Sequence, residues 1–357
     1  MRADLGSHFV LPGPLLAIER NGIGHINDTF VGTYRGSSGN VQFVHQRINT
    51  SVFGNVAAVM ENIGRVTRHV REKLESAGVR DPERRVLTLI QTRAGADYYR
   101  DEDGSYWRTY AFIDKSRTSN EVRSSREAYE IALAFGRFAT LLADLPGGPL
   151  HETIPAFHDT VTRYAQLIGA IETDVVNRAM GVQAEIRFAA DRDVLASDIQ
   201  SAPGARPAHN DAKANNVLLD ADTGEGLCII DLDTVMPGSL LSDFGDLARS
   251  AACDTPEDER DLEKIHVQPE RFDALARGYA AGAASVLISG DTGLFVRAAK
   301  TMTFESGIRF LADFLNGDRY FKIRRAGQNL DRARAQFALL RSFEKHEEDL
   351  LAGLALV

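Results

Sequence analysis

The chain has 357 residues, of which 25% are charged and 44% are hydrophobic. This composition is typical of a globular protein and excludes disorder over most of the length, because the apolar residues can offset the entropy lost on folding. The net charge of -9 disfavours an electrostatic nucleic-acid-binding protein, which is normally basic. Two cysteines cannot cross-link a chain of this size, so a disulfide scaffold is excluded and a reducing compartment is indicated.

The sequence contains no run that approaches the roughly 18 apolar residues needed to cross a bilayer. The first residues also lack the cationic segment and apolar stretch of a secretory signal. We therefore expect a cytoplasmic protein that binds neither membrane nor nucleic acid. The sequence does not specify the oligomeric state, and a monomer is compatible with it.

The first hundred residues are predicted to be mostly strands. Short β-rich runs broken by glycine clusters are typical of an antiparallel meander. The expected strands are 15–18, 29–34, 41–48, 85–91 and 106–113. One helix interrupts them, because apolar residues recur at spacings of three and four from Val56 to Leu74, and Asn55 precedes this run as an N-cap.

Helical periodicity dominates after Asp114, beginning with an apolar face from Ile131 to Leu145. Further helices are expected around 159–180, 190–200, 270–288, 292–317 and 330–354, and one β segment, 217–233, interrupts them. The sequence therefore predicts an α+β fold of two lobes. Residues 1–113 form a β-rich lobe and 114–357 a mostly helical lobe, with a hinge at about 110–118. A cleft between two lobes is a common ligand site.

The densest chemical signal begins with the spacing His-x-Asp-x-x-x-x-Asn, which contains Asp211 and Asn216. Two apolar strands around a polar turn follow, and the second strand ends at Asp231. Paired as a hairpin, these strands place Val217 opposite Ile230 and Asn216 opposite Asp231, and the pattern allows a slip of one or two residues. Two oxygen-bearing side chains then lie side by side, close to the loop that carries Asp211.

This order matches enzymes that transfer phosphoryl groups. In them a loop Asp accepts the proton of the attacking hydroxyl, and an Asn and a second Asp hold metal. Oxygen ligands of this kind suit Mg²⁺, which binds one or two protein groups together with substrate phosphates. The sequence therefore predicts Asp211 as the catalytic base and Asn216 and Asp231 as Mg²⁺ ligands.

Other residues near this motif have simpler interpretations. Asp243-Phe244-Gly245 spells the metal triplet of protein kinases but follows a Pro-Gly loop, so we expect Asp243 and Asp246 to brace the site through hydrogen bonds to backbone. We expect His209 to support the loop before the base. Cys228 alternates within an apolar strand and is expected in the core.

Segments spread along nearly the whole chain resemble the aminoglycoside-phosphotransferase-like kinases, which share the two-lobed protein-kinase-like fold. Within that group the sequence is similar to the bacterial N-acetylhexosamine 1-kinases. The segments that carry the resemblance are Gly24 to Thr29, Gln46 to Thr50, Val59 to Ile63, Phe157 to Thr160, His209 to Asn216, Ile230 to Ser239, Gly307 to Asp313 and Gly317 to Phe321.

The resemblance implies ATP-dependent phosphorylation of the anomeric C1 hydroxyl of N-acetylglucosamine or N-acetylgalactosamine. By matching position it supports the roles given above to the base and to the Mg²⁺ ligands. It also implies that His25, Arg309 and Tyr320 contact the sugar, with Asp233 close to them. The expected partners are therefore a small-molecule sugar and ATP.

The nucleotide is expected on the N-terminal lobe. Gly22 and Gly24 lie between two predicted strands, where a glycine-rich turn lets backbone N–H groups approach phosphate oxygens, although a plain hairpin turn explains them equally well. The strand end at Tyr110 and Phe112 is the expected adenine-reading hinge, by position and resemblance; an ordinary apolar strand end is the alternative.

The third predicted strand departs from protein kinases, which place a phosphate-binding Lys there. If Val44 faces the adenine, strand alternation puts Gln46 at the lysine position, and the resembling hexosamine kinases also have Gln there. Arg47 then points to the opposite face, unless a bulge reverses the two.

The nearest alternative function is the same chemistry on another small hydroxyl acceptor: a neutral hexose, an amino alcohol or an aminoglycoside. A cationic acceptor favours an acidic cleft rim, and the acidic segment 254–263 is explained more simply as a surface helix. The pair Arg309 and His25 favours a neutral polyol. A non-catalytic nucleotide-binding protein would lack the base or a metal ligand, and all three groups are present. The preference at C2 and C4 depends on single contacts that the sequence does not place.

Overall fold

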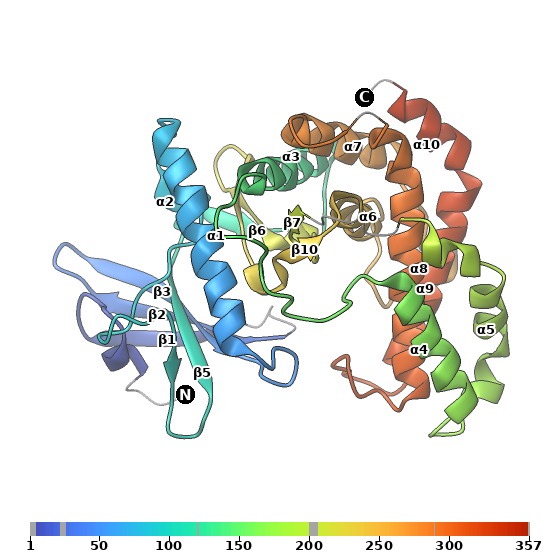
Figure 1. Cartoon of the computed structure of the whole chain (residues 1–357), viewed down its shortest axis with the longest axis horizontal. Helices are drawn as coiled ribbons and strands as arrows, with labels where there is room; N and C mark the ends of the chain where they lie inside the picture. Colours follow the sequence, from blue (N-terminus) through green and yellow to red (C-terminus); the bar gives the residue numbers. More distant parts are fainter. Residues whose placement is uncertain (1–4, 22–25, 120, 200–205, 289, 356–357) are drawn as a thin grey trace.

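The computed structural model describes residues 5–21, 26–119, 121–199, 206–288 and 290–355. Figure 1 shows a β-sheet region at one end of the molecule and a larger helical region at the other, with the long helix α1 (Val56–Ser76) between them. The expected α+β fold, with strands in the N-terminal part and helices in the C-terminal part, is confirmed.

The N-terminal sheet has the strand order β1-β2-β3-β5-β4, and its pairs are antiparallel. Its strands are β1 (Leu15–Asn21), β2 (Asp28–Arg35), β3 (Asn40–Ile48), β4 (Tyr99–Arg100) and β5 (Tyr106–Ala111). In the β3–β5 register Gln46 lies opposite Arg108. Helix α1 begins where expected, because Asn55 Oδ1 accepts a hydrogen bond from the Ala58 amide at 3.1 Å.

The strand expected at 85–91 is wrong. Its first residue belongs to the short helix α2 (Pro82–Arg85), which has a proline in its first turn. The remainder pairs with β5 only at the single bridge between Leu89 and Tyr110. The chain then turns to the N-terminal segment, where Thr92 bridges to Phe9, so the segment is divided between two partners and forms no continuous ladder.

The C-terminal part contains two small sheets and most of the helices. The sheets are β6 (Ser116–Thr118), β8 (Val217–Asp220) and β9 (Gly226–Ile229), and β7 (Arg206–Ala208) with β10 (Met236–Gly238). The helices are α3 (Ser125–Leu142), α4 (Thr160–Thr173), α5 (Gln183–Ala190), α6 (Leu240–Ala251), α7 (Pro269–Ala283), α8 (Phe295–Leu315), α9 (Gln328–Lys345) and α10 (Glu347–Leu354).

Three expected helices have different limits in the structure. The helix expected at 159–180 ends at Thr173, because Asp174 takes a left-handed conformation with φ 35°. The helix expected at 190–200 is wrong, since α5 ends at Ala190 and only a 3₁₀ turn (Asp193–Ser197) follows. The helix expected at 330–354 is divided into α9 and α10 at His346.

The main core joins α1 to the helical region. Val59 and Ile63 of α1 belong to the same buried cluster as Ile131 and Phe135 of α3. A second cluster lies between α4, α8 and α9. The main core therefore contains residues from both sides of the predicted lobe boundary at residue 113. The boundary itself stays a prediction. Within the described ranges, none of the helices is both long and apolar enough to span a membrane.

Candidate active site

The predicted base and metal ligands lie at the open end of the β8–β9 hairpin. Val217 pairs with Ile229, so the expected pairing with Ile230 is wrong by one residue, within the slip that the pattern allowed. A bulge between Leu218 and Leu219 shifts the register. The Ile230 amide still donates to the Asn216 carbonyl oxygen at 2.9 Å, so Asn216 stays beside the end of the second strand.

Asp211 and Asn216 are in direct contact. Asn216 Nδ2 donates to the Asp211 carbonyl oxygen at 2.9 Å and to its Oδ2 at 3.1 Å. Lys213 Nζ lies 2.5 Å from Asp211 Oδ1. Burial alone would raise the pKa of Asp211, but the charge and hydrogen bond of Lys213 outweigh it and lower the pKa to about 2. Asp211 is therefore an ionised carboxylate with a fixed orientation. Sequence reasoning missed Lys213, although a cation two residues after the base is a usable signal.

Asp231 has left-handed backbone with φ 59°, a conformation that Asp tolerates better than most residues. Burial and the nearby carboxylates of Asp233 and Asp211 raise the pKa of Asp231 well above its ordinary value. The carboxylates of Asp231 and Asp211 thus lie close enough to repel each other, and a divalent cation bound between them would relieve this repulsion.

The donor set fits Mg²⁺. The amide nitrogen of Asn216 donates to Asp211, so the amide oxygen of Asn216 is the atom left for a metal. Among the described residues, no group of three His, Cys, Asp or Glu side chains forms a metal site by itself. A site with two protein oxygens is the kind that Mg²⁺ completes with water and phosphate oxygens.

The residues before the base are held by buried hydrogen bonds. Asn210, with φ 59°, donates from Nδ2 to the carbonyl oxygens of Thr234 and Met236 at 3.1 and 3.2 Å. His209 Nδ1 accepts from the Asp211 amide, and its Nε2 donates to the Ile230 carbonyl oxygen. His209 therefore supports the loop, as expected.

The carboxylate of Asp243 braces this loop, also as expected. Its two oxygens accept from the amides of His209 and Asn210 at 2.8 and 2.7 Å. The same expectation is wrong for Asp246, which pairs with the Arg249 side chain instead of backbone. Gly245 serves packing, because a Cβ there would lie 2.4 Å from the Ala298 carbonyl oxygen of α8.

Of the predicted sugar-binding residues, Arg309 lies on α8, Tyr320 follows it, and Asp233 lies in the turn after the hairpin. His25 falls outside the described residues. The Arg309 guanidinium lies over the ring of Phe157 at 4.9 Å and that of Tyr320 at 6.0 Å. Tyr320 is 52% exposed, so its ring is open to a ligand. The loop that carries Tyr320 also touches the N-terminal lobe, because Lys322 Nζ donates to the Ile26 carbonyl oxygen at 3.3 Å.

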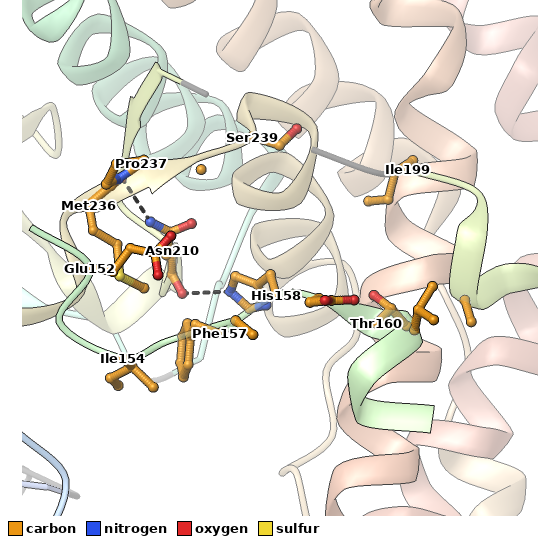
Figure 2. Close-up of a pocket in the computed structure, with 15 residues that line it drawn as sticks. Glu152, Ile154, Phe157, His158, Thr160, Ile199, Asn210, Met236, Pro237 and Ser239 are labelled. Atoms are coloured by element: carbon orange, nitrogen blue, oxygen red, sulfur yellow. Dashed lines mark hydrogen bonds between the residues drawn. The ribbon is translucent and has the colours of Figure 1, made fainter. Parts of the chain in front are cut away.

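A buried ion pair links this region to the catalytic loop, and sequence reasoning missed it. His158 Nδ1 donates to Glu305 Oε1 at 2.8 Å, and its Nε2 donates to the Asn210 carbonyl oxygen at 2.7 Å. Figure 2 shows His158 between Asn210 and Thr160, whose hydroxyl donates to Glu305 Oε2 at 2.7 Å. Both ring nitrogens face acceptors, so His158 carries two protons and a positive charge. The sequence signal was an acidic residue inside the apolar helix α8.

Asp233 is paired with a buried arginine that sequence reasoning also missed. Arg108 Nη1 donates to Asp233 Oδ1 at 2.8 Å, Nη2 contacts Oδ2, and Nε donates to Gln46 Oε1 at 2.9 Å. Gln46 thus points toward this cluster. Arg47 points to the other face, where it pairs with Asp28, as strand alternation predicted.

The structure describes only some of the residues that are predicted to bind the nucleotide. Gly22 and Gly24 lie outside the described residues. The Tyr110 ring is buried and its hydroxyl has no hydrogen-bond partner in the described part of the chain. Phe112 is 36% exposed and lines a small hollow with Thr33 and Gln42, beside the expected hinge. The nucleotide roles of these residues stay predictions.

A cavity of about 440 Å³ is lined in part by Asn210, the residue before the predicted base (Figure 2). Its lining includes Phe157, His158, Asn210 and Ser239, but none of the predicted site residues that the structure describes. Phe157 lines this cavity and also contacts Arg309, so the cavity and the predicted sugar side meet at that residue.

The sequence profile of the "Phosphotransferase enzyme family" matches residues 17–283, which is more than half of the chain. The chain belongs to this family. The match covers the predicted base and Mg²⁺ ligands and ends before Arg309 and Tyr320. The broader part of the predicted function, a small-molecule phosphotransferase, is therefore confirmed.

Solved structures share the fold of this family member over most of its length. A putative aminoglycoside phosphotransferase from Ralstonia eutropha JMP134 is 15% identical, with a TM-score of 0.58 and coverage of 96% of this chain and 97% of the other. Choline kinase from Cryptosporidium parvum Iowa II is 13% identical, with a TM-score of 0.55 and coverage of 93% and 90%. A spectinomycin phosphotransferase in complex with ADP and spectinomycin is 14% identical, with a TM-score of 0.50 and coverage of 96% of each chain.

Proposed function

We propose that this phosphotransferase is an N-acetylhexosamine 1-kinase. It transfers the γ-phosphoryl group of ATP to the anomeric C1 hydroxyl of N-acetylglucosamine or N-acetylgalactosamine, and the products are the sugar 1-phosphate and ADP. The family match, the ADP bound by the spectinomycin phosphotransferase and the motif segments spread along the chain support this proposal.

The observation that carries the acceptor class is the positive charge around Phe157. Arg309 lies over its ring, and Arg163 donates from two nitrogens to its carbonyl oxygen at 3.1 Å. The buried carboxylate of Glu305 lies 3.5 Å from Arg309 and 2.8 Å from His158, so one negative charge is shared between two cations. A cationic amino alcohol or aminoglycoside would be repelled here, whereas a neutral sugar offers hydroxyl oxygens that accept from Arg309 and a ring face that suits Tyr320.

Asp211 receives the C1 hydroxyl in this mechanism. Its carboxylate, held by Lys213 and Asn216, accepts a hydrogen bond from the hydroxyl and so orients the oxygen toward the γ-phosphorus. The new bond forms between this oxygen and phosphorus as the bond to the β-phosphate oxygen breaks. The hydroxyl proton passes to Asp211 and then to solvent.

Asn216 and Asp231 would hold Mg²⁺, which supplies neutralisation of the β- and γ-phosphate charge when bound. The protein's own contribution is the alignment of hydroxyl and phosphate. Lys213 adds a positive charge beside the reacting oxygen through its contact with Asp211.

The test is ADP release with MgATP over a panel of acceptors: N-acetylglucosamine, N-acetylgalactosamine, glucose, galactose, mannose, choline and kanamycin. We expect turnover of the acetylated sugars, with phosphorus NMR placing the phosphate on C1. The turnover rate of Asp211→Asn should fall by about 10³-fold or more. The exposed turn residue Asp222 provides the matched control, and Asp222→Asn should keep the wild-type rate. Turnover of choline or kanamycin alone would overturn the proposed acceptor class but leave the proposed role of Asp211 as the base intact.

A further inference from the structure

Arg108 is among the largest fully buried side chains of the protein, with 1% of its side chain exposed. Its two Nη atoms donate to the two oxygens of Asp233, and its Nε–H donates to Gln46. Removing an arginine and an aspartate from water costs free energy that only close pairing offsets. The pair therefore fixes two backbone segments that lie far apart in the sequence.

These segments are strand β5 and the metal loop, which we define as residues 231–236. Two more side chains from the N-terminal part reach the same loop. Asn27 Nδ2 lies 3.5 Å from Asp233 Oδ2, and Asn62 Nδ2 donates to the Val235 carbonyl oxygen at 3.1 Å. The position of Asp231 is thus set by contacts with the β-sheet region and α1 as well as by its own hairpin.

Protein kinases depend on a different ion pair, between a Lys on the third strand and a Glu on the helix that follows. In this chain the strand position is taken by Gln46, whose oxygen accepts from Arg108. Glu61 of α1 lies 3.0 Å from His151 instead. Among the described residues, the ion pair between Arg108 and Asp233 joins the N-terminal sheet to the loop that follows the catalytic hairpin.

We propose that Arg108 is a positioning residue for the Mg²⁺ site: by holding Asp233 it fixes the metal loop, and with it the Asp231 carboxylate, relative to the nucleotide-binding sheet. This inference rests on the proposed role of Asp231 as a metal ligand. Pairing also neutralises Asp233, so that its negative charge is directed to Arg108 and not to the metal.

The test measures Mg²⁺ directly, without turnover. Isothermal titration calorimetry gives the Kd of ADP in EDTA and in excess Mg²⁺. The Kd in EDTA divided by the Kd in Mg²⁺ measures how much the metal strengthens ADP binding. Arg108→Lys keeps the charge but removes the two-nitrogen fork. Because loss of a residue that orients a metal ligand costs about 10- to 100-fold in metal affinity, we expect the ratio to fall by about that factor, with the Kd in EDTA unchanged.

Two comparisons make the result specific. Arg192 also forms a two-nitrogen fork, to Glu344 at 2.8 and 2.9 Å, outside the site, so Arg192→Lys should keep the wild-type ratio. Asp233→Asn should lower the ratio as Arg108→Lys does, and the double variant should lose no more than either single variant, because both act through one contact.

Asp231→Asn distinguishes the metal-ligand role of Asp231 from the positioning role of Arg108. If Asp231→Asn loses the Mg²⁺ effect and Arg108→Lys retains it, the positioning role is wrong and the metal ligand stands. If Asp231→Asn retains the effect, the proposed metal ligand itself is wrong, and the positioning role falls with it. A defect of Asp233→Asn that is confined to the KM of the sugar would also overturn the positioning role.

Discussion

The buried ion pair between Glu305 and His158 allows a quantitative test of the electrostatics beside the site. Glu305 accepts hydrogen bonds from His158 and Thr160 at 2.8 and 2.7 Å. Burial opposes its ionisation, but the charge and hydrogen bond of His158 outweigh burial and hold the pKa of Glu305 at about 2, compared with an ordinary 4.5. We predict that Glu305→Gln lowers the free energy of unfolding by about 3 kcal/mol at pH 7.

This magnitude has two independent sources. The lowered pKa gives about 3 kcal/mol, since each pH unit between folded and unfolded pKa is worth 1.36 kcal/mol. Breaking a buried ion pair costs about 3–5 kcal/mol in other proteins, because one charge is left without a partner. In this variant the charge left in the interior is that of His158, whose side chain is only 9% exposed.

The pH dependence has a definite sign. Burial opposes the charge of His158, but Glu305 outweighs it and raises the pKa of His158, so this contribution is present below about pH 6.5 and is lost as pH rises through the folded pKa. The contribution of Glu305 is present above its unfolded pKa of 4.5 and is lost as pH falls toward about 2. Asp246 and Arg309 also act on His158, with opposite signs. Glu305→Gln should therefore remove the alkaline loss of stability that His158 causes.

Urea denaturation followed by circular dichroism from pH 5 to pH 9 measures these effects. Glu344→Gln is the matched control, because Glu344 pairs with Arg192 but is 32% exposed, so its loss should cost at most about 1 kcal/mol. Equal losses in the two variants, or an unchanged loss of stability above pH 7 in Glu305→Gln, would show that the ion pair does not supply this stability.

Three further predictions concern single residues. Asp231→Asn should abolish MgATP turnover while raising the thermal midpoint of the metal-free protein, because it removes a carboxylate that its neighbours repel; a lower midpoint in scanning calorimetry contradicts this. Gly245→Ala should destabilise the protein by about 1–3 kcal/mol in urea, since its Cβ would lie 2.4 Å from the Ala298 carbonyl oxygen, and an unchanged midpoint contradicts it. Arg309→Ala should raise the KM of the sugar about tenfold or more and leave the KM of ATP unchanged. An increase in both KM values would contradict the placement of Arg309 on the sugar side of the site.

Much of the fold is predictable because its signals are local. The stripe from Val56 to Leu74 and the cap at Asn55 fix α1, and glycine-bounded apolar runs fix most strands. The segment 85–91 was mispredicted because its β pattern is real but its partners are divided between β5 and the N-terminal segment. Such a division depends on tertiary contacts, which periodicity does not contain.

The candidate site also contains residues that local sequence predicts and residues that only tertiary contacts reveal. Asn216 and Asp231 flank one hairpin and Asp211 lies in the loop just before it, so local pairing brings the three residues together. Arg108 and Glu305 are recognisable only by their partners, Asp233 and His158, which lie in distant segments. A charged residue inside an apolar strand or helix signals a buried partner, but the sequence does not identify that partner.

The shared core of α1 and α3 has a consequence for how the molecule unfolds. In a protein built of two independent domains, the smaller can melt while the larger persists. Here the apolar stripe of α1 is buried against the helical region, and detaching the sheet with α1 would expose Val59, Ile63 and Val66 at once. We therefore expect one cooperative unfolding transition for the chain, and a fragment that ends near residue 113 should aggregate instead of folding.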